Sequence, residues 1–195
     1  LNTSSPFLGD ELLIKSSIRY ELEHLLNVAI YDEEAVFRKN RSIATVAFPY
    51  WNYFPRAPII MDMNYMNERY ILIVNHLKCC GDGFIESGNT DDEEYRRLQA
   101  ILLLKDYVDT YFPSEKTIIL GDLNDLITDQ ANTNVFQAIL NDPSNYSFAD
   151  SSIAVGPSSN WSYPTWPSHL DHIIITNDLF YETQNNGSYV QGLPY

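Results

Sequence analysis

The sequence predicts a single α/β domain, and three observations support this prediction. The chain has 195 residues, of which 45% are apolar, enough for one domain with a sizeable core. Short runs of β-branched and apolar residues recur between polar turns, as strands do. One longer segment carries the start and stop signals of a helix. No repeat, linker or change of composition divides the range 1–195, so we expect one domain.

Strands are expected first at 26–31 and 42–48, where apolar and polar residues alternate. The ranges 57–64 and 69–77 form the clearest hairpin candidate, because two apolar runs flank a short polar connection. Both of these runs read as central strands of a sheet.

A glycine-rich stretch at 79–89 predicts an exposed loop, and a helix follows it. Thr90 is the expected N-cap, with Glu93 completing a capping box, and Pro113 ends the helix. The expected buried face consists of Tyr95, Leu98, Ile101, Leu102, Leu104 and Val108.

The second half begins with a buried strand at 116–120, which the glycine and polar residues of "GDLND" follow directly. We expect a short helix at 132–140 and a loop-rich, aromatic region at 144–167. The range 172–176 reads as a final strand.

The formal net charge of −14 argues against a protein that holds nucleic acid through a broad basic face. An acidic site can still recruit a divalent cation that faces a phosphate, although an acidic surface kept for solubility explains the charge as well. Cys79 and Cys80 are adjacent, and a bridge between neighbours is strained because their Cα atoms lie only about 3.8 Å apart. We expect free thiols, or a bridge to a cysteine outside this chain.

No apolar run is long enough to span a bilayer, so we expect no transmembrane segment. The chain begins at Leu1 rather than at a methionine, which suggests a processed product or a piece of a longer protein. A low lysine content and several N-x-S/T sites suggest a secreted or periplasmic protein.

Polar residues stand at the entry or the carboxyl end of several expected strands: Arg56, His76, Asp122, Asn124 and Asp171. Such positions are a common way to build a site on a rigid frame. Each residue also has a structural alternative. Asp122 and Asn124 could form an Asx-turn pair, His76 could be a hydrogen-bonded structural histidine, and Arg56 could pair with a surface acid.

The order of these motifs carries more information than any one of them. R-A-P, N-H-L-K, "RRLQ", I-I-L-G-D-L-N-D and "TWPSHLDHIIIT" follow one another along the chain. In this order, over roughly 27–176, the sequence resembles the endonuclease/exonuclease/phosphatase superfamily of DNase I-like metal-dependent phosphoesterases. The resemblance implies a four-layer α/β/β/α sandwich, incomplete at both ends of this chain.

The resemblance also implies chemistry, namely hydrolysis of phosphate esters by water with Mg²⁺ or Mn²⁺. It makes Asp122 the residue that positions the water and touches the metal, and Asn124 the residue that holds the phosphate. It makes His76 a donor to a phosphoryl oxygen and Arg56 a substrate contact. Asp171 becomes the carboxylate that orients the general base, with His172 an incidental neighbour.

The sequence departs from the family pattern at both ends. No S-D-H occurs in 177–195, and no Gln-Glu with its metal-binding glutamate occurs before Asn27 in the expected context. We therefore expect the central part of a family domain, close to inactive by itself because general-base assistance is worth about 10²–10⁴-fold.

Three functions remain open at this stage. The first is a monomeric nuclease whose partner is nucleic acid or another phosphodiester substrate. The second is a phospholipid or inositol-phosphate hydrolase, and the third is a non-catalytic binding domain on the same frame. The loop 79–89 and the aromatic residues Tyr50, Trp51, Tyr53 and Phe54 are expected to border the site and to select the substrate, unless they have a core or lid role.

Overall fold

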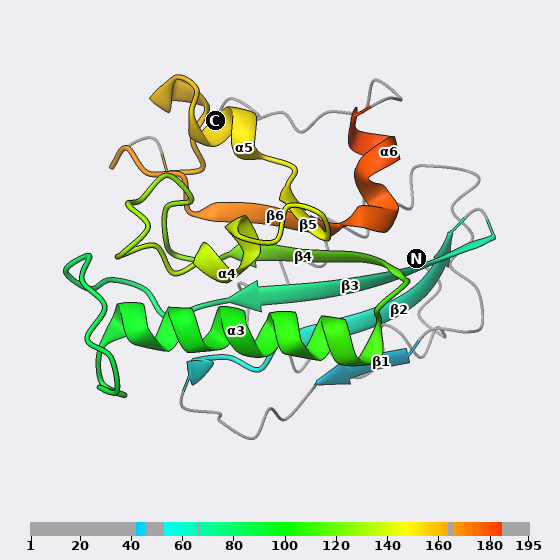
Figure 1. Ribbon diagram of the computed structural model, residues 1–195, viewed down its shortest axis with the longest axis horizontal. Coiled ribbons are helices and arrows are strands. Elements are labelled where there is room, and N and C mark those ends of the chain that lie inside the picture. The colour runs from blue at the N-terminus through cyan, green and yellow to red at the C-terminus, as the bar shows by residue number, and fades with distance from the viewer. Residues whose placement is uncertain (1–41, 46–52, 66, 164–165, 185–195) are drawn as a thin grey trace, which may run out of the picture.

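The structure is a computed structural model that describes residues 42–45, 53–65, 67–163 and 166–184. Within these residues the strands form one six-stranded sheet. The strand order is β1-β2-β3-β4-β6-β5, and Figure 1 shows the strands side by side. The strands are β1 (Ser42–Thr45), β2 (Ile59–Tyr65), β3 (Glu68–His76), β4 (Lys116–Asp122), β5 (Tyr146–Phe148) and β6 (Asp171–Thr176).

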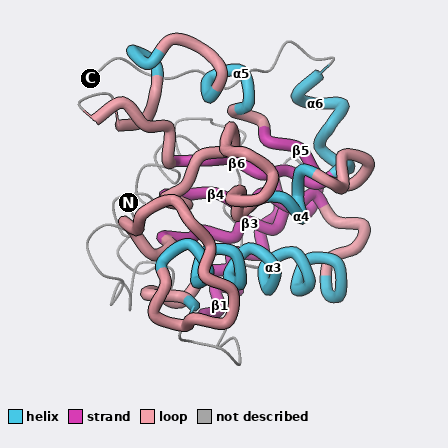
Figure 2. The backbone as a smooth tube through the Cα atoms, turned by 60° about the vertical axis from the view of Figure 1, so that its left-hand side comes forward, coloured by secondary structure: helices cyan, strands magenta, loops and turns pink. Residues whose placement is uncertain are grey.

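The chain connects these strands in two ways. β2 and β3 form the expected antiparallel hairpin, whereas β3 and β4 are parallel. A parallel pair needs a crossover connection, and the helix α3 (Glu93–Tyr111) supplies it. Figures 1 and 2 show α3 running along one face of the sheet. β6 then pairs antiparallel with β4 and brings the last strand beside it.

The N-terminus of α3 differs from its prediction. Asp92, rather than Thr90, is the N-cap, and its carboxylate accepts a hydrogen bond from the backbone N–H of Tyr95 at 2.6 Å. Asp92 satisfies an end N–H that has no partner within the helix, so the helix begins later than expected. At the other end α3 stops at Tyr111, two residues before Pro113, as the proline predicts.

The buried face of α3 is also rotated from the expected one. Ala100, Ile101, Leu104 and Val108 are buried, but Leu102 is 39% exposed, so its assignment to the core was wrong. Arg97 is buried on the same face, where ion pairs compensate its charge. A hydrophobic pattern could not reveal this, because it gives a buried arginine no weight.

The sheet separates two groups of core residues. On the α3 side a large cluster includes Ile71, Ile73, Ile119 and Ile174, all at most 1% exposed, and each such side chain contributes about 1.5–3 kcal/mol to stability by its burial. On the other side lies a smaller cluster of Ile59, Met61 and Val74, with Leu72 and Leu120 packed against it. Alternation along a strand sends neighbouring residues to opposite faces.

The region 144–167 is more structured than expected, since it contains β5, the short helix α5 (Ser151–Ala154) and the 3₁₀ turn η3 (Ser158–Asn160). The helix expected at 132–140 is shorter, and only α4 (Gln137–Leu140) forms. The 3₁₀ turn η4 (Asn177–Leu179) and the helix α6 (Phe180–Gln184) follow β6.

Several expectations fall outside the described residues: the strand at 26–31, the end of the strand at 42–48, and Tyr50 and Trp51. Tyr53 and Phe54 are described and pack against the α3-side core, so the core role holds for these two. Among the described residues the strands form this one sheet, and none of their helices has the length and apolar character to cross a membrane.

Candidate functional site

Three of the expected site residues lie side by side at one end of the sheet. His76 pairs with Asp122 in the register of β3 and β4, and Asp122 pairs with Asp171 in the register of β4 and β6. Directly paired residues project from the same face of a sheet. The three side chains therefore share one face, the one that carries Val74 and Leu120.

Gly121 makes this close approach possible. It pairs with Asn75 across β3 and β4 and has a φ of +125°. A Cβ atom at this position would lie 2.0 Å from the carbonyl oxygen of Asn75, far inside van der Waals contact. Only glycine fits a position with both constraints, so the glycine of "GDLN" sets the spacing of the strands just before the site residues.

The loop after β4 fixes Asp122 and Asn124 relative to each other. The backbone N–H of Asn124 donates to Oδ1 of Asp122 at 3.1 Å, and Nδ2 of Asn124 donates to the carbonyl of Leu77 at 3.1 Å. Asn124 has a φ of +55°, a conformation that asparagine tolerates. The Asx-turn alternative is therefore realised at Oδ1 of Asp122, while Oδ2 lies 3.7 Å from Nε2 of His76.

The electrostatics single out Asp122 and His76. Burial, and then the charge of Asp171, raise the pKa of Asp122 to about 6. Burial, and then the charge of Arg56, lower the pKa of His76. Arg56 thus lies close enough to act on both groups, and it favours the ionised form of Asp122. A carboxylate and a neutral imidazole with perturbed pKa values in one place are typical of functional sites.

These residues fit a divalent cation. Asp122 is half-buried, and Asp171 pairs with it in register, so two acidic groups converge on one edge of the sheet. Their repulsion is part of what raises the pKa of Asp122, and a hard cation bound by carboxylate oxygens relieves such repulsion. Nδ1 of His76 is buried and has no hydrogen-bond partner among the described residues.

His172, expected to be an incidental neighbour, belongs to a second cluster on the opposite face. It is 1% exposed and packs edge-on against Phe136 and Phe148. Its Nδ1 lies 2.7 Å from Oδ2 of Asp150, and its Nε2 lies 2.8 Å from the carbonyl oxygen of Asp125. Alternation along β6 separates it from Asp171, so His172 has a defined structural role away from the candidate site.

The protons in this second cluster follow from its acceptors. His169 accepts from the backbone N–H of Ser162 at Nδ1, so its Nε2–H donates to Oδ2 of Asp150 at 2.9 Å. Burial raises the pKa of Asp150, but the hydrogen bonds from His169 and His172 outweigh it and bring the pKa to about 2. Both nitrogens of His172 face oxygen acceptors, so an N–H on either side of the ring has a partner.

The spacing of Asp150, His169 and His172 would also suit a metal ion. A histidine nitrogen must be unprotonated to bind a metal. In this structure the nitrogens that face Asp150 are hydrogen-bonded to it, so the three side chains satisfy one another, and a metal ion would have to displace these contacts.

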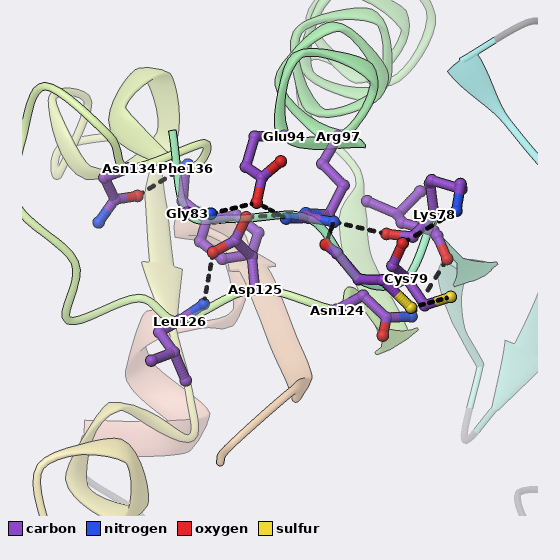
Figure 3. Close-up of polar contacts among 12 residues, drawn as sticks. Lys78, Cys79, Gly83, Glu94, Arg97, Asn124, Asp125, Leu126, Asn134 and Phe136 are labelled. Atoms are coloured by element: carbon purple, nitrogen blue, oxygen red, sulfur yellow. Dashed lines mark hydrogen bonds and ion pairs between the residues drawn. The ribbon is translucent and has the colours of Figure 1, made fainter. Parts of the chain in front are cut away.

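A third polar group ties α3 to the loops beside the site (Figure 3). Nε of Arg97 donates to Oδ2 of Asp125 at 2.8 Å, and Nη2 lies 3.2 Å from Oε1 of Glu94. Nη1 donates to the carbonyls of Lys78 and Cys80, both at 2.8 Å. A buried arginine with all three nitrogens engaged holds the chain after β3 and the chain after β4 in fixed relation.

Sequence reasoning did not single out Asp125, Asp150 and His169 or explain Arg97. Arg97 and Asp125 lie inside the quoted motifs "RRLQ" and "GDLND", so a buried pairing could have been suspected from their residue types. Asp150 lies in the region read as a loop, and only its position two residues after the short strand β5 marks it.

Comparison with known proteins finds a matching family model and matching solved structures. A family model described as "Endonuclease/Exonuclease/phosphatase family" matches residues 24–193, and no curated protein matches the chain. Solved structures that match include TDP2 of D. rerio with a single-strand DNA product, with a TM-score of 0.46 and 12% identity, covering 71% of this chain and 52% of that one. The human Nocturnin catalytic domain with bound sulfate matches with a TM-score of 0.40 and 14% identity, covering 71% and 47%.

The chain thus spans about half the length of these solved structures. The match to the family model covers most of the chain and includes all five of the residues that the motifs select. The α/β class expected from the sequence is confirmed, and the described residues contain one sheet of the expected DNase I-like sandwich. The chain belongs to the endonuclease/exonuclease/phosphatase family.

Proposed function

We propose that this protein is a metal-dependent phosphoesterase that hydrolyses phosphodiester bonds, most simply as a nuclease. The observation that carries the proposal is the convergence of His76, Asp122 and Asp171 at one end of three neighbouring strands. Membership of a family of phosphoesterases supports the reaction class. The charge of −14 is consistent with a substrate that is bound transiently rather than through a wide basic surface.

Each residue has a role that matches its surroundings. Asp122, whose Oδ1 is held by the N–H of Asn124, positions the attacking water through its other oxygen. His76, kept neutral by burial and by Arg56, donates an N–H to a phosphoryl oxygen as negative charge develops. Arg56 contacts the substrate phosphate, where a guanidinium suits phosphate geometry.

Asn124 and Asp171 complete the site. Asn124, anchored to the carbonyl of Leu77, holds the loop and the phosphate in register with Asp122. Asp171 is exposed at the start of β6, so its carboxylate is accessible to orient a histidine base. Asp122 would hold the divalent cation, which when bound supplies positive charge to stabilise the transition state.

Hydrolysis of bis(p-nitrophenyl) phosphate and of plasmid DNA tests the proposal, using the protein in its full encoded length with Mg²⁺ or Mn²⁺. We expect activity that EDTA abolishes and that Asp122→Ala reduces by about 10²–10⁴-fold. Asp178→Asn is the matched control, because Asp178 is an exposed acid in η4. A folded protein that is inactive on both substrates would overturn the nuclease reading. Activity on inositol phosphates or phospholipids alone would then select the second enzyme class.

A further inference from the structure

Two adjacent cysteines form a feature that the phosphoesterase chemistry does not use. Cys79 and Cys80 lie in the loop after β3, and both are exposed. Sγ of Cys80 donates to Sγ of Cys79 at 2.9 Å. Figure 3 shows this contact at the edge of the Arg97 group. Two thiols in direct contact and open to solvent are placed to react with each other.

The backbone conformation that brings the thiols together is unusual. In an extended chain, neighbouring side chains point to opposite sides, which would separate the two sulfur atoms. Here Cys80 has a φ of +74°, and Gly81 follows with a φ of +108°. A residue with a side chain rarely adopts such a φ unless its surroundings impose it, and such positions cluster at functional sites.

Arg97 imposes this conformation. Its Nη1 donates to the carbonyls of Lys78 and Cys80, the residues on either side of Cys79. Arg97 is itself buried and paired with Asp125 and Glu94, so it is a rigid anchor. The fold thereby holds the dithiol in a bent conformation that the unfolded chain would adopt only rarely.

We propose that Cys79 and Cys80 form a reversible redox site, in which a small disulfide such as oxidised glutathione converts the two thiols into a disulfide between neighbouring residues. The thiolate of Cys79 attacks the small disulfide, forms a mixed disulfide and releases one glutathione thiolate. The thiolate of Cys80, its proton having passed to solvent, then attacks the sulfur of Cys79 and releases the second glutathione. Two electrons pass from the cysteines to the small disulfide.

The local chemistry suits this sequence of steps. The hydrogen bond runs from Cys80 to Cys79 and raises the pKa of the Cys80 thiol, so we assign the first attack to Cys79. The charge of Lys78 acts on the pKa of Cys80 in the direction that favours its thiolate, the second nucleophile. A bridge between neighbours is strained, and strained, exposed disulfides are reduced readily, so the reaction is reversible.

Hydrogen bonds of Leu77 connect the two cysteines to the ends of β3 and β4. Nδ2 of Asn124 donates to the carbonyl of Leu77, and the N–H of Leu77 donates to the carbonyl of Asp122. Leu77 lies two residues before Cys79. A change in the chain at Cys79 therefore acts on the loop that holds Asp122 and Asn124 in place.

Intact-protein mass spectrometry after exposure to oxidised glutathione tests the proposal. The native protein should lose two hydrogen atoms and keep no glutathione, and dithiothreitol should restore the original mass. Cys79→Ser and Cys80→Ser should each retain one glutathione, because the second thiol that resolves the mixed disulfide is missing. A native protein that instead accumulates glutathione adducts at both cysteines would overturn the proposal.

A second measurement isolates the contribution of the fold. We expect the native protein to form the bridge at a ratio of oxidised to reduced glutathione about tenfold lower than the urea-unfolded protein, because the fold already holds the two thiols in contact. Equal ratios would show that the bent backbone has no part in the reaction. This comparison needs no enzymatic activity and also covers variants that fold poorly.

The consequence for hydrolysis rests on the proposed function and is read out separately. Oxidation should lower the rate of phosphodiester hydrolysis in the native protein and leave the rate of the Cys80→Ser variant without a bridge-dependent change. If the mass changes as expected but neither redox state hydrolyses any substrate, the phosphoesterase proposal fails and the redox site stands.

Discussion

This fold contains two aspartate–histidine pairs on opposite faces of one sheet, and they differ in separation, burial and pKa. On one face Asp150 and His172 are in direct hydrogen-bonding contact at 2.7 Å and fully buried. On the other face Asp122 and His76 lie 3.7 Å apart, and their side chains are 27% and 19% exposed. The pKa of Asp150 falls to about 2, whereas the pKa of Asp122 rises to about 6.

The difference shows that burial alone does not decide the state of a carboxyl group. Burial raises the pKa of both aspartates. The pKa of Asp150 nevertheless falls, because two histidines and the N–H of Ile173 donate to its carboxylate. Asp122 receives one backbone donor and faces the charge of Asp171. The satisfied pair stabilises the fold, and the unsatisfied pair is left able to interact with a substrate or an ion.

The largest expected effect comes from breaking the satisfied pair. Asp150→Asn removes the buried carboxylate that contacts His169, His172 and the N–H of Ile173, and removing one partner of a buried pair costs about 3–5 kcal/mol. Urea unfolding measures this loss. Asp106→Asn, at an exposed position of α3, is the control and should leave the unfolding midpoint unchanged. A small loss in Asp150→Asn would mean that the two pairs are more alike than their geometry indicates.

The Asp122–His76 pair should give the opposite result, with a large loss of activity and little loss of stability. His76→Ala removes a donor from the candidate site, and loss of one such donor reduces catalysis by about 10²–10³-fold. The free energy of unfolding should change little, because His76 makes no close hydrogen bond to Asp122. Rates and urea curves on the same samples check both points, with Tyr181→Ala in α6 as an exposed control. A variant that unfolds easily but retains its rate would reverse the assignment.

The pH dependence of stability should show two slopes of opposite sign when EDTA removes metal ions. The folded pKa of Asp150 is about 2, against 3.8 for the free group, so its contribution is present above pH 4 and is lost as the pH falls toward 2. The folded pKa of Asp122 is about 6, so stability falls as the pH rises from 4 to 6. The change in the free energy of unfolding amounts to about 2 kcal/mol for Asp150 and about 3 kcal/mol for Asp122.

Urea unfolding at several pH values measures both slopes. Asp122→Asn should reduce the fall in stability between pH 4 and 6 and leave the change at lower pH in place. The part that remains belongs to Asp129, whose pKa burial also raises to about 6, and an unchanged fall in this variant would exclude Asp122 as its source.

The smallest expected effect is stabilisation by a metal ion. At pH 7 Mg²⁺ binding to ionised Asp122 should raise stability by about 1 kcal/mol when the ion exceeds its Kd several-fold. Thermal unfolding with and without Mg²⁺ measures the shift, and Asp122→Asn should lack it. An equal shift in the variant would place the ion elsewhere in the protein.

How far the sequence could predict this structure depends on the kind of interaction. Residues whose role follows from position along a strand, such as His76 and Asp122, could be placed together, because parallel strands end at the same edge. The contact of Arg97 with Asp125 joins a helix to a distant loop and has no periodic signal, so only the residue types within the two motifs point to it. The structural role of His172 could not be predicted for a related reason. Its partner, Asp150, follows a strand of three residues, too short for alternation to reveal.

The parallel pairing of β3 and β4 sets the order in which this site can assemble as the chain folds. The β2–β3 hairpin needs only local contacts and can form within about 1–10 μs. His76 meets Asp122 only after α3 has crossed the sheet and β4 has docked, a step that closes a long loop and is slow for that reason. A partly folded chain that holds only the hairpin therefore displays His76 without its carboxylate partner. The candidate site is therefore complete only when β4 and β6 have paired with the rest of the sheet.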